Sequence, residues 1–228
     1  MGRLRSENED NLVVDPELGF FIVADGMGGH ESGELASSIA VVEIATHVRE
    51  QIRFRKEAGA ILVEAIQRAN ADIIRSSPKD IDYGEMGSTV VLALYVDNRV
   101  LIAHVGDSRA YRMHNGSLKQ LSQDYTFLAD WVNEGRITAK EARTHPDRHG
   151  IYAALGIDED VEVEISQHSW DDESCLLLCS DGLTDMVNEE EIATILRLSD
   201  DPQEACSMLL DRANKKGGED NITVIIVC

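Results

Sequence analysis

The sequence predicts an α+β fold in which helices and strands are segregated into separate layers. Two long helices are expected in succession, over about residues 33–55 and 57–75, and a group of strands follows over about residues 88–113. Consecutive strands joined by short connections pair antiparallel, whereas a parallel sheet needs a crossover, usually a helix, between its strands. This order of elements favours an α+β sandwich over a repeating βαβ fold.

Length and charge restrict the class of protein. A chain of 228 residues suits one domain, and we expect a single domain over residues 1–228. The 42 acidic residues exceed the 21 basic ones, and the net charge of -21 argues against a nucleic-acid partner or an anionic membrane surface. The sequence has no apolar run of about 18 residues and no signal-peptide core, so we expect no membrane association and a cytoplasmic location.

The first half of the chain follows recognisable local patterns. The apolar run GFFIVA at 19–24, closed by DGMGGH, predicts a buried strand that leads into a loop. Apolar residues recur at helical spacing in the two helices that follow. Strands are predicted over 88–96, 99–105 and 108–113, and the Asn115-Gly116 pair predicts a tight hairpin after the last of them.

The second half begins with a polar, helix-prone region at about 124–154. It is either an insertion on the rim of the core or a pair of exposed helices. The core resumes with a buried strand at 175–179. Helices over 189–197 and 203–216 and a closing strand over 221–228 complete it.

Four aspartates stand at the ends of predicted strands. Asp25 follows FFIVA, Asp107 follows VLIAHVG, Asp181 follows CLLLCS, and Asp220 directly precedes NITVIIV. If the first three strands run one way and the fourth runs opposite, all four carboxylates meet at one edge of the core. Carboxylates this close repel one another unless a cation compensates, and oxygen ligands without His or Cys point to Mg²⁺ or Mn²⁺.

Three further features accompany these aspartates. Gly26 has no side chain, so its carbonyl can approach a metal beside the Asp25 carboxylate. Arg5 carries a planar guanidinium suited to bidentate contact with phosphate oxygens, and Glu9 and Asp10 add two carboxylates.

The four cysteines are Cys175, Cys179, Cys206 and Cys228. They form no C-x-x-C pair and have no histidines at ligand spacing, so we expect buried thiols in a reducing compartment.

Eight motifs, taken in order, carry a resemblance to a known family. They are RSENED, ADGMGGH, GSTVV, VGDSRAY, LSQD, HPDR, LCSDGLTD and EDNITVIIV. Their order and spacing resemble those of bacterial protein phosphatases of the type 2C, metal-dependent class, over nearly the whole chain. The resemblance implies a four-layer α-β-β-α sandwich of two antiparallel sheets flanked by helices, with a flap insertion at about 124–155.

The same resemblance implies a hydrolase that removes phosphate from phosphoserine and phosphothreonine in proteins. A water that bridges two Mn²⁺ or Mg²⁺ ions would attack phosphorus directly. Phosphoprotein substrates, an opposing bacterial serine/threonine kinase and a monomeric state are expected with it.

By resemblance, each metal ligand can be assigned to a position. Asp25 would bridge the two metals, Asp181 and Asp220 would complete the shell of one, and Glu9 and the Gly26 carbonyl that of the other.

The remaining roles also follow from the resemblance. Arg5 would hold the substrate phosphate, and Asp107 would share Asp181 at a third, weaker metal site. Asp10 would support the metal-bound waters. With Asp25, Arg5 forms the expected catalytic pair.

The sequence departs from the family pattern at three places. The family commonly has a strand before its Arg motif, and with four residues before Arg5 we expect this strand to be absent or shortened. Met27 stands where some members have a histidine as candidate general acid, so the proton donor is unassigned. DYT at 124–126 and RHGIYAALG at 148–156 replace the DHS and RNxITRALG of many relatives.

Other activities fit the sequence less well. Cys206 and Arg212 have the C-x5-R spacing of cysteine phosphatases, but their segment has no glycines for a phosphate loop and predicts a helix. DGMGGH lacks the Gly-Lys-Ser/Thr of a nucleotide P-loop. A non-catalytic phosphoprotein-binding module and a two-metal hydrolase of another phosphoester remain as alternatives.

Overall fold

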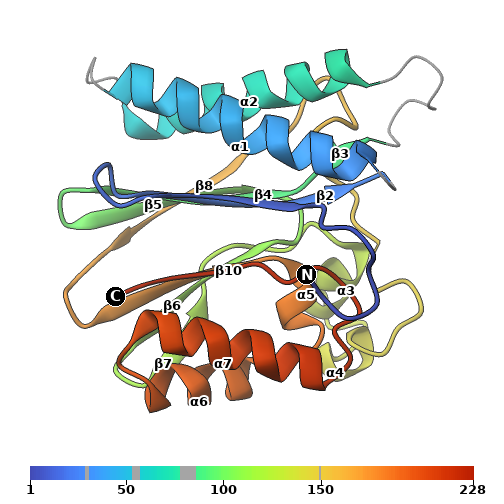
Figure 1. Ribbon diagram of the computed structural model, residues 1–228, viewed down its shortest axis with the longest axis vertical. Helices are drawn as coiled ribbons and strands as arrows, with labels where there is room; N and C mark the ends of the chain where they lie inside the picture. The colour runs from blue at the N-terminus through green and yellow to red at the C-terminus, as the bar shows by residue number, and fades with distance from the viewer. Residues whose placement is uncertain (29–30, 53–56, 78–85, 149) are drawn as a thin grey trace.

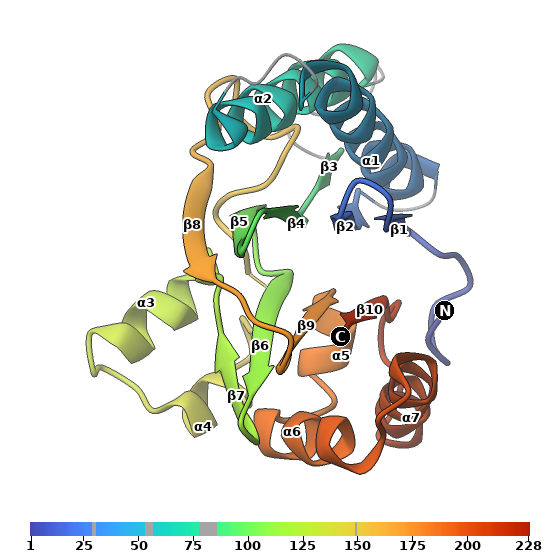
Figure 2. The same cartoon turned by 90° about the vertical axis from the view of Figure 1, so that its left-hand side faces the viewer.

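The computed structural model describes residues 1–28, 31–52, 57–77, 86–148 and 150–228, which form four layers (Figure 1). Helices α1 (Glu31–Gln51) and α2 (Ala58–Ser76) cover one sheet, and α6 (Glu189–Leu198) and α7 (Pro202–Lys215) cover the other. The two sheets face each other between these helix pairs, as Figure 2 shows from a second side. The predicted α+β sandwich of two antiparallel sheets is confirmed.

The first sheet has six strands within the described residues, in the order β1-β2-β4-β5-β8, with β3 paired to β2. All of its pairs are antiparallel. The strands are β1 (Asp10–Asp15), β2 (Phe20–Met27), β3 (Gly87–Ser88), β4 (Val90–Val96), β5 (Arg99–Val105) and β8 (Glu164–Ser169).

The second sheet has four strands in the described part of the chain, in the order β10-β9-β6-β7, again antiparallel throughout. The strands are β6 (Arg109–His114), β7 (Ser117–Gln120), β9 (Ser174–Cys179) and β10 (Val224–Val227). The predicted closing strand at 221–228 therefore begins three residues later.

Successive side chains of a strand point to opposite faces of the sheet, and in the central strands both faces are buried, which explains why their apolar runs are continuous. In β2, Phe20 and Ile22 pack toward the α1–α2 layer, whereas Phe21 and Val23 pack between the two sheets. In β9, Leu178 lies between the sheets and Leu177 packs toward α6 and α7. A strand that is covered on both faces has no solvent side, so it needs no polar alternation.

The predicted hairpin forms between β6 and β7. Asn115 and Gly116 connect them with φ of 50° and 75°, the left-handed pair of values that an Asn-Gly turn accommodates. The two long helices are also present where the sequence predicts them. Residues 53–55 of the first prediction and residues 29–30 of the ADGMGGH motif lie outside the described residues.

The region at 124–154 contains two short helices, α3 (Phe127–Asn133) and α4 (Ala139–Ala142), between β7 and β8. They lie beside the sandwich rather than in its layers (Figure 2). The structure therefore contains the helix pair of the second interpretation. We call residues 124–155 the flap segment.

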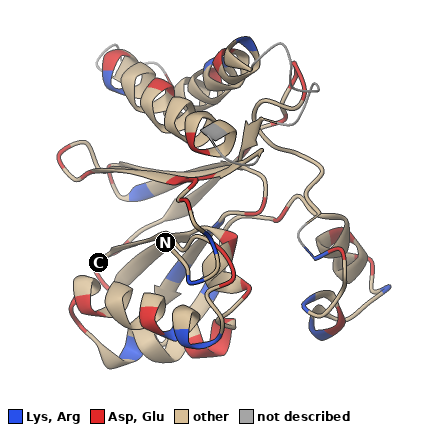
Figure 3. Cartoon of the chain, turned by 45° about the vertical axis from the view of Figure 1, so that its right-hand side comes forward, with Lys and Arg blue, Asp and Glu red and all other residues tan. Residues whose placement is uncertain are grey.

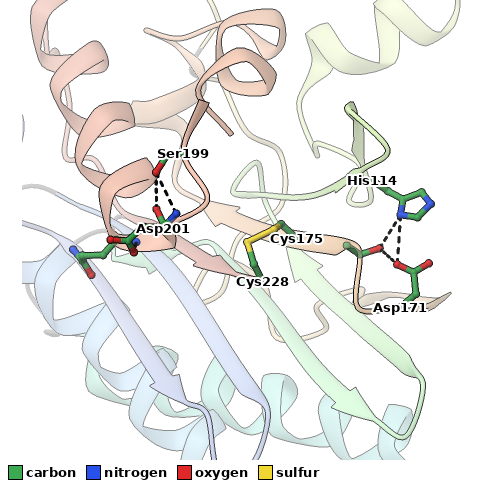
Figure 4. The surroundings of a disulfide bond; sticks show 8 residues. His114, Asp171, Cys175, Ser199, Asp201 and Cys228 are labelled. Carbon is green, nitrogen blue, oxygen red and sulfur yellow. Dashed lines mark hydrogen bonds and ion pairs between the residues drawn. A yellow bond between two sulfur atoms is a disulfide. The ribbon is translucent and has the colours of Figure 1, made fainter. Parts of the chain in front are cut away.

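The expectation of four buried thiols is wrong for two cysteines. Cys175 and Cys228 form a disulfide, which Figure 4 shows beside the ends of β9 and β10. The register of this strand pair places Val227 opposite Leu176, so the next pair brings the two cysteines face to face. Cys179 is a free buried thiol, as expected, whereas Cys206 is free but only partly buried. Spacing in sequence could not reveal a pair that strand pairing creates.

Among the described residues, no helix has the length and apolar character that a membrane crossing requires. Acidic positions occur on the outer helices and on the flap segment (Figure 3).

Candidate active site

Four elements bring the predicted aspartates to one cavity of about 430 Å³. Asp25 lies in β2, Asp107 follows β5, Asp181 begins the short helix α5 (Asp181–Thr184), and Asp220 precedes β10. Strands β2 and β5 are both antiparallel to β4 and so run the same way. Their carboxyl ends meet at one edge of the first sheet, while the loops of the second sheet close the opposite wall.

Seven of the eight predicted site residues line this cavity. They are Arg5, Glu9, Asp25, Gly26, Asp107, Asp181 and Asp220. Met27, Thr89, Ile151 and Glu219 also contribute to its lining. The segment before β1 and the loop before β10 therefore reach the same place from opposite ends of the chain.

Asp10 lies behind this wall, directly opposite Asp25 in the β1–β2 register. Its Oδ2 accepts hydrogen bonds from Ser180 Oγ at 2.9 Å and Thr223 Oγ1 at 2.7 Å, and its Oδ1 has no hydrogen-bond partner. Burial raises its pKa to about 6, although these two hydrogen bonds act in the opposite direction. Asp10 thus joins the two halves of the sandwich under the cavity.

The backbone of Asp25 is fixed by two hydroxyl-bearing residues. Thr89 Oγ1 accepts from the Asp25 N–H at 3.1 Å, and the Thr89 N–H donates to the Asp25 carbonyl at 2.8 Å. Ser88 Oγ donates to the same carbonyl at 3.1 Å. The GSTVV motif therefore holds the central carboxylate in place.

The segment before β1 is held by Asn221. Its Oδ1 accepts from the Glu9 N–H at 2.8 Å, and its Nδ2 donates to the Glu7 carbonyl at 2.9 Å. Sequence reasoning missed Asn221, Thr223, Ser180 and Thr89 as site-forming residues. Asn221 and Thr223 follow Asp220 in the EDNITVIIV motif, so that motif contained their signal.

Gly26 lies where a side chain cannot fit. A Cβ there would lie 2.0 Å from the Gly33 carbonyl oxygen and 2.6 Å from the Glu9 carbonyl oxygen. The Gly26 N–H donates to this Glu9 carbonyl at 3.1 Å. The first turn of α1 can approach β2 closely only because both positions are glycine.

The acidic groups perturb one another. The pKa values of Asp25 and Asp107 are raised well above their ordinary value, first by burial and then by repulsion from Asp181. The arrangement has an excess of negative charge that a cation would relieve.

Arg5 is a basic residue in the lining of this cavity. Its Nη2 lies 2.7 Å from Asp220 Oδ2, and half of its side chain is exposed. This hydrogen bond raises the pKa of the guanidinium. Arg5 is accessible from the cavity and is placed to meet an anion.

The residues fit a hard divalent cation in their chemistry. The donors are oxygens, the buried Asp10 carboxyl retains an unpartnered oxygen, and the neighbouring carboxyls are held close enough to repel. Within the described ranges, no three His, Cys, Asp or Glu side chains are already gathered so that they could hold an ion.

The cysteine alternative is not supported by the fold. Cys206 lies within α7, burial raises the pKa of its thiol, and Arg212 binds Glu191. A helix interior has no phosphate-cradling loop.

The two-sheet sandwich and its acidic cavity define a class of proteins, and comparison of the sequence with known protein families identifies that class. The sequence model of the protein phosphatase 2C family matches residues 5–214. The chain belongs to this family and is a serine/threonine protein phosphatase.

Named relatives agree with this assignment. The serine/threonine phosphatase stp of Listeria monocytogenes serotype 4b is 38% identical over 231 residues, covering 99% of this chain and 92% of that protein. The crystal structure of the Mycobacterium tuberculosis phosphatase PstP/Ppp superposes with a TM-score of 0.88 at 35% identity, covering 99% of this chain and 93% of that one.

A second PstP structure contains the catalytic domain in complex with two manganese ions. It matches with a TM-score of 0.85 at 33% identity, covering 99% of this chain and 93% of that chain.

Proposed function

We propose that this chain hydrolyses phosphoserine and phosphothreonine in proteins at the cavity lined by Asp25, Asp107, Asp181 and Asp220. The observation that carries the proposal is the meeting of these four carboxylates, from four separate elements, beside Arg5. The manganese-bound relative supports the same interpretation. Residues 1–228 would act as one catalytic domain, with 124–155 as its flap.

We propose that Asp25 holds both of two Mn²⁺ or Mg²⁺ ions. Asp181 and Asp220 would hold one of them, and Glu9 with the Gly26 carbonyl would hold the other. When bound, these ions would supply Lewis-acid activation of water and offset the charge of the phosphate. We also propose that Asp107 and Asp181 would hold a third ion.

The protein side chains orient the reactants. Arg5 binds the phosphate oxygens by charge-assisted hydrogen bonds and releases Asp220 from its ion pair. Ser88 and Thr89 fix Asp25, and Asn221 fixes Glu9. Asp10 anchors Thr223 and Ser180 beneath the cavity and would support the metal-bound waters. The Met27 thioether has no acidic proton to donate, so the proton donor is another group.

The biological setting belongs to the same proposal. A serine/threonine kinase would supply the phosphoprotein substrates, and the enzyme would act as a monomer in the cytoplasm. The Cys175–Cys228 disulfide is the feature that counts against a strictly reducing location.

Substitution of the central carboxylates tests the metal assignment. Asp25→Asn and Asp181→Asn keep the side-chain shape but lose the negative charge, so activity on a phosphothreonine peptide with Mn²⁺ should fall by on the order of a thousandfold. Glu219→Gln is the matched control, because Glu219 lines the same cavity and is not an assigned ligand. Activity of either Asn variant within about threefold of the parent would contradict the assignment.

A further inference from the structure

An aromatic cluster lies on the flap segment beside the site. We call Tyr125, Phe127 and Tyr152 the aromatic face. The Tyr152 ring centroid lies 5.8 Å from that of Tyr125 and 5.2 Å from that of Phe127. Tyr125 in turn stacks on the buried His104 of β5 at 5.5 Å, which anchors the face to the first sheet.

The outer part of this face is open to solvent. Phe127 is 59% exposed and Tyr152 is 39% exposed. Among the described residues, these two are the exposed members of the Phe, Tyr and Trp set, and they touch each other. Isolated exposed apolar residues are common on protein surfaces, whereas a contiguous aromatic pair beside an active site suggests a binding surface.

The face adjoins the catalytic cavity at two points. The Tyr125 N–H donates to the Gly106 carbonyl at 3.0 Å, one residue before Asp107. The Tyr152 N–H donates to the Tyr125 carbonyl at 3.1 Å, and its neighbour Ile151 lines the cavity. Tyr152 is thus the immediate chain neighbour of a cavity-lining residue, with about 3.8 Å between the two Cα atoms.

Carboxylates surround the phenol groups. Burial and then the charge of Asp130 raise the pKa of the Tyr152 phenol, and Tyr125 Oη lies 3.5 Å from Glu164 Oε2. Glu162 acts on both phenols, and burial followed by Glu164 raises the pKa of Tyr125 to about 12. The rings therefore lie in a negative field, which favours a cationic ligand over a neutral or acidic one.

The molecule contains one example of the recognition that such a surface allows. The Arg112 guanidinium lies 5.0 Å from the Trp170 ring centroid and also pairs with Asp171 at 3.1 Å. An arginine side chain can thus contact an aromatic ring and a carboxylate together, because its guanidinium is planar and its stem is apolar. Tyr152 and Asp130 present the same pair of groups to solvent.

We propose that the aromatic face binds an arginine or lysine side chain of the phosphoprotein, near the phosphorylated residue, and thereby selects substrates with basic neighbours. The inference rests on the proposed phosphatase function. Tyr125 and Tyr152 lie within DYT and RHGIYAALG, where the chain departs from the DHS and RNxITRALG of many relatives. The proposed selectivity therefore depends on positions of the flap segment at which this chain differs from many relatives.

Phosphothreonine peptides that differ at one residue test the proposal. Arg, Leu, Ala or Glu is placed at each of about four positions on either side of the phosphothreonine, and kcat/KM is measured with Mn²⁺. At one or more positions, the Arg peptide should exceed the Ala peptide by on the order of tenfold, and the Glu peptide should be the poorest. The Arg-to-Ala ratio is the readout, so a general change in activity cancels.

Variants then assign this ratio to the face. Tyr152→Thr and Phe127→Ser should bring it close to one, Tyr152→Phe should retain most of it because the ring remains, and Asp130→Asn should lower it. Leu198→Ser is the control, since Leu198 is 70% exposed at the end of α6 and should leave the ratio unchanged.

Three results would overturn the proposal: no preference for Arg in the parent, an equal gain with Leu, or a ratio that survives Tyr152→Thr together with Phe127→Ser. Hydrolysis of p-nitrophenyl phosphate by the parent distinguishes a failure of the proposed selectivity from a failure of the proposed phosphatase function. If the parent hydrolyses it with Mn²⁺ but shows no Arg preference, only the selectivity is wrong. If the parent hydrolyses neither compound, the proposed function fails first and the selectivity falls with it.

Discussion

At the scale of single residues, the site depends on side chains that hold other side chains. Asn221 fixes the Glu9 and Glu7 backbone, and Thr89 fixes the Asp25 backbone. Arg5 differs from these because it is half exposed and faces the cavity through an ion pair with Asp220. An exposed pair of this kind costs little to break, so Arg5 is available to a phosphate.

Arg5→Ala should therefore reduce kcat/KM on a phosphothreonine peptide by roughly tenfold to a hundredfold, the value of a hydrogen bond to a charged group, about 1.5–3 kcal/mol. Arg5→Lys should retain part of the activity, because it keeps the charge but loses the planar fork. Steady-state kinetics with saturating Mn²⁺ checks this. Arg3→Ala is the control, since Arg3 is exposed and does not line the cavity; equal losses in the two Ala variants would argue against a phosphate contact.

At the scale of elements, the strand β10 is the short piece on which one wall of the site depends. It has four residues and follows directly on Asp220, Asn221 and Thr223. It lies at an edge of the second sheet, where it pairs with β9 alone among the described strands. The Cys175–Cys228 disulfide attaches its far end to β9, which limits fraying of this edge strand.

Removal of the disulfide should lower stability. Cys228→Ser opens a link across a sequence separation of 53 residues, for which a loss of about 2–4 kcal/mol in the free energy of unfolding is typical. Urea unfolding measures this loss of stability when the parent and the variant show the same dependence of the unfolding free energy on urea concentration. Cys206→Ser should have no comparable effect, because Cys206 is free. A thiol reductant should destabilise the parent but not Cys228→Ser; equal responses would mean that the disulfide does not form.

At the scale of the whole molecule, three apolar clusters hold four layers together, and several acidic side chains gather at one cavity. The clusters lie between the first helix pair and its sheet, between the sheets, and between the second sheet and α6–α7. At the cavity, burial and mutual repulsion raise the pKa values of Asp25 and Asp107. Folding and metal binding are therefore linked through the same protons.

Because the folded-state pKa values of Asp25 and Asp107 are raised, the direction in which stability depends on pH follows. Without metal, the folded protein keeps protons on Asp25 and Asp107 that the unfolded chain releases above about pH 4. Their contribution to stability is thus greatest at low pH and decreases as pH rises toward their folded pKa values. Mn²⁺ binds the deprotonated groups, so its stabilising effect should increase with pH.

Thermal unfolding from about pH 5 to about pH 8 tests this, with and without Mn²⁺. The increase in Tm caused by Mn²⁺ should be larger at the higher pH. Asp25→Asn should lose most of this increase and should also flatten the pH dependence of the metal-free protein. A metal-induced shift that is the same at every pH in the parent would contradict the linkage.

The sequence by itself predicted the segregation of helices and strands and the aspartates that line the cavity. Continuous apolar runs such as FFIVA and CLLLC predicted strands covered on both faces, and Asn115-Gly116 predicted a hairpin that the structure contains. Asp25, Asp107, Asp181 and Asp220 could be selected because each stands next to a buried strand. These signals are local, because the apolar pattern of a strand and the residue types of a turn can be recognised within a few neighbouring positions.

Tertiary structure alone decided which distant residues meet. Asn221 reaches Glu9 across 212 positions, Cys228 meets Cys175 through strand register, and Tyr125 stacks on His104 between the flap segment and β5. Strand β8, which completes the first sheet, gave no usable pattern because its side chains are only partly buried or exposed. Such contacts depend on sheet register and loop paths, which are set by the packing of the whole chain.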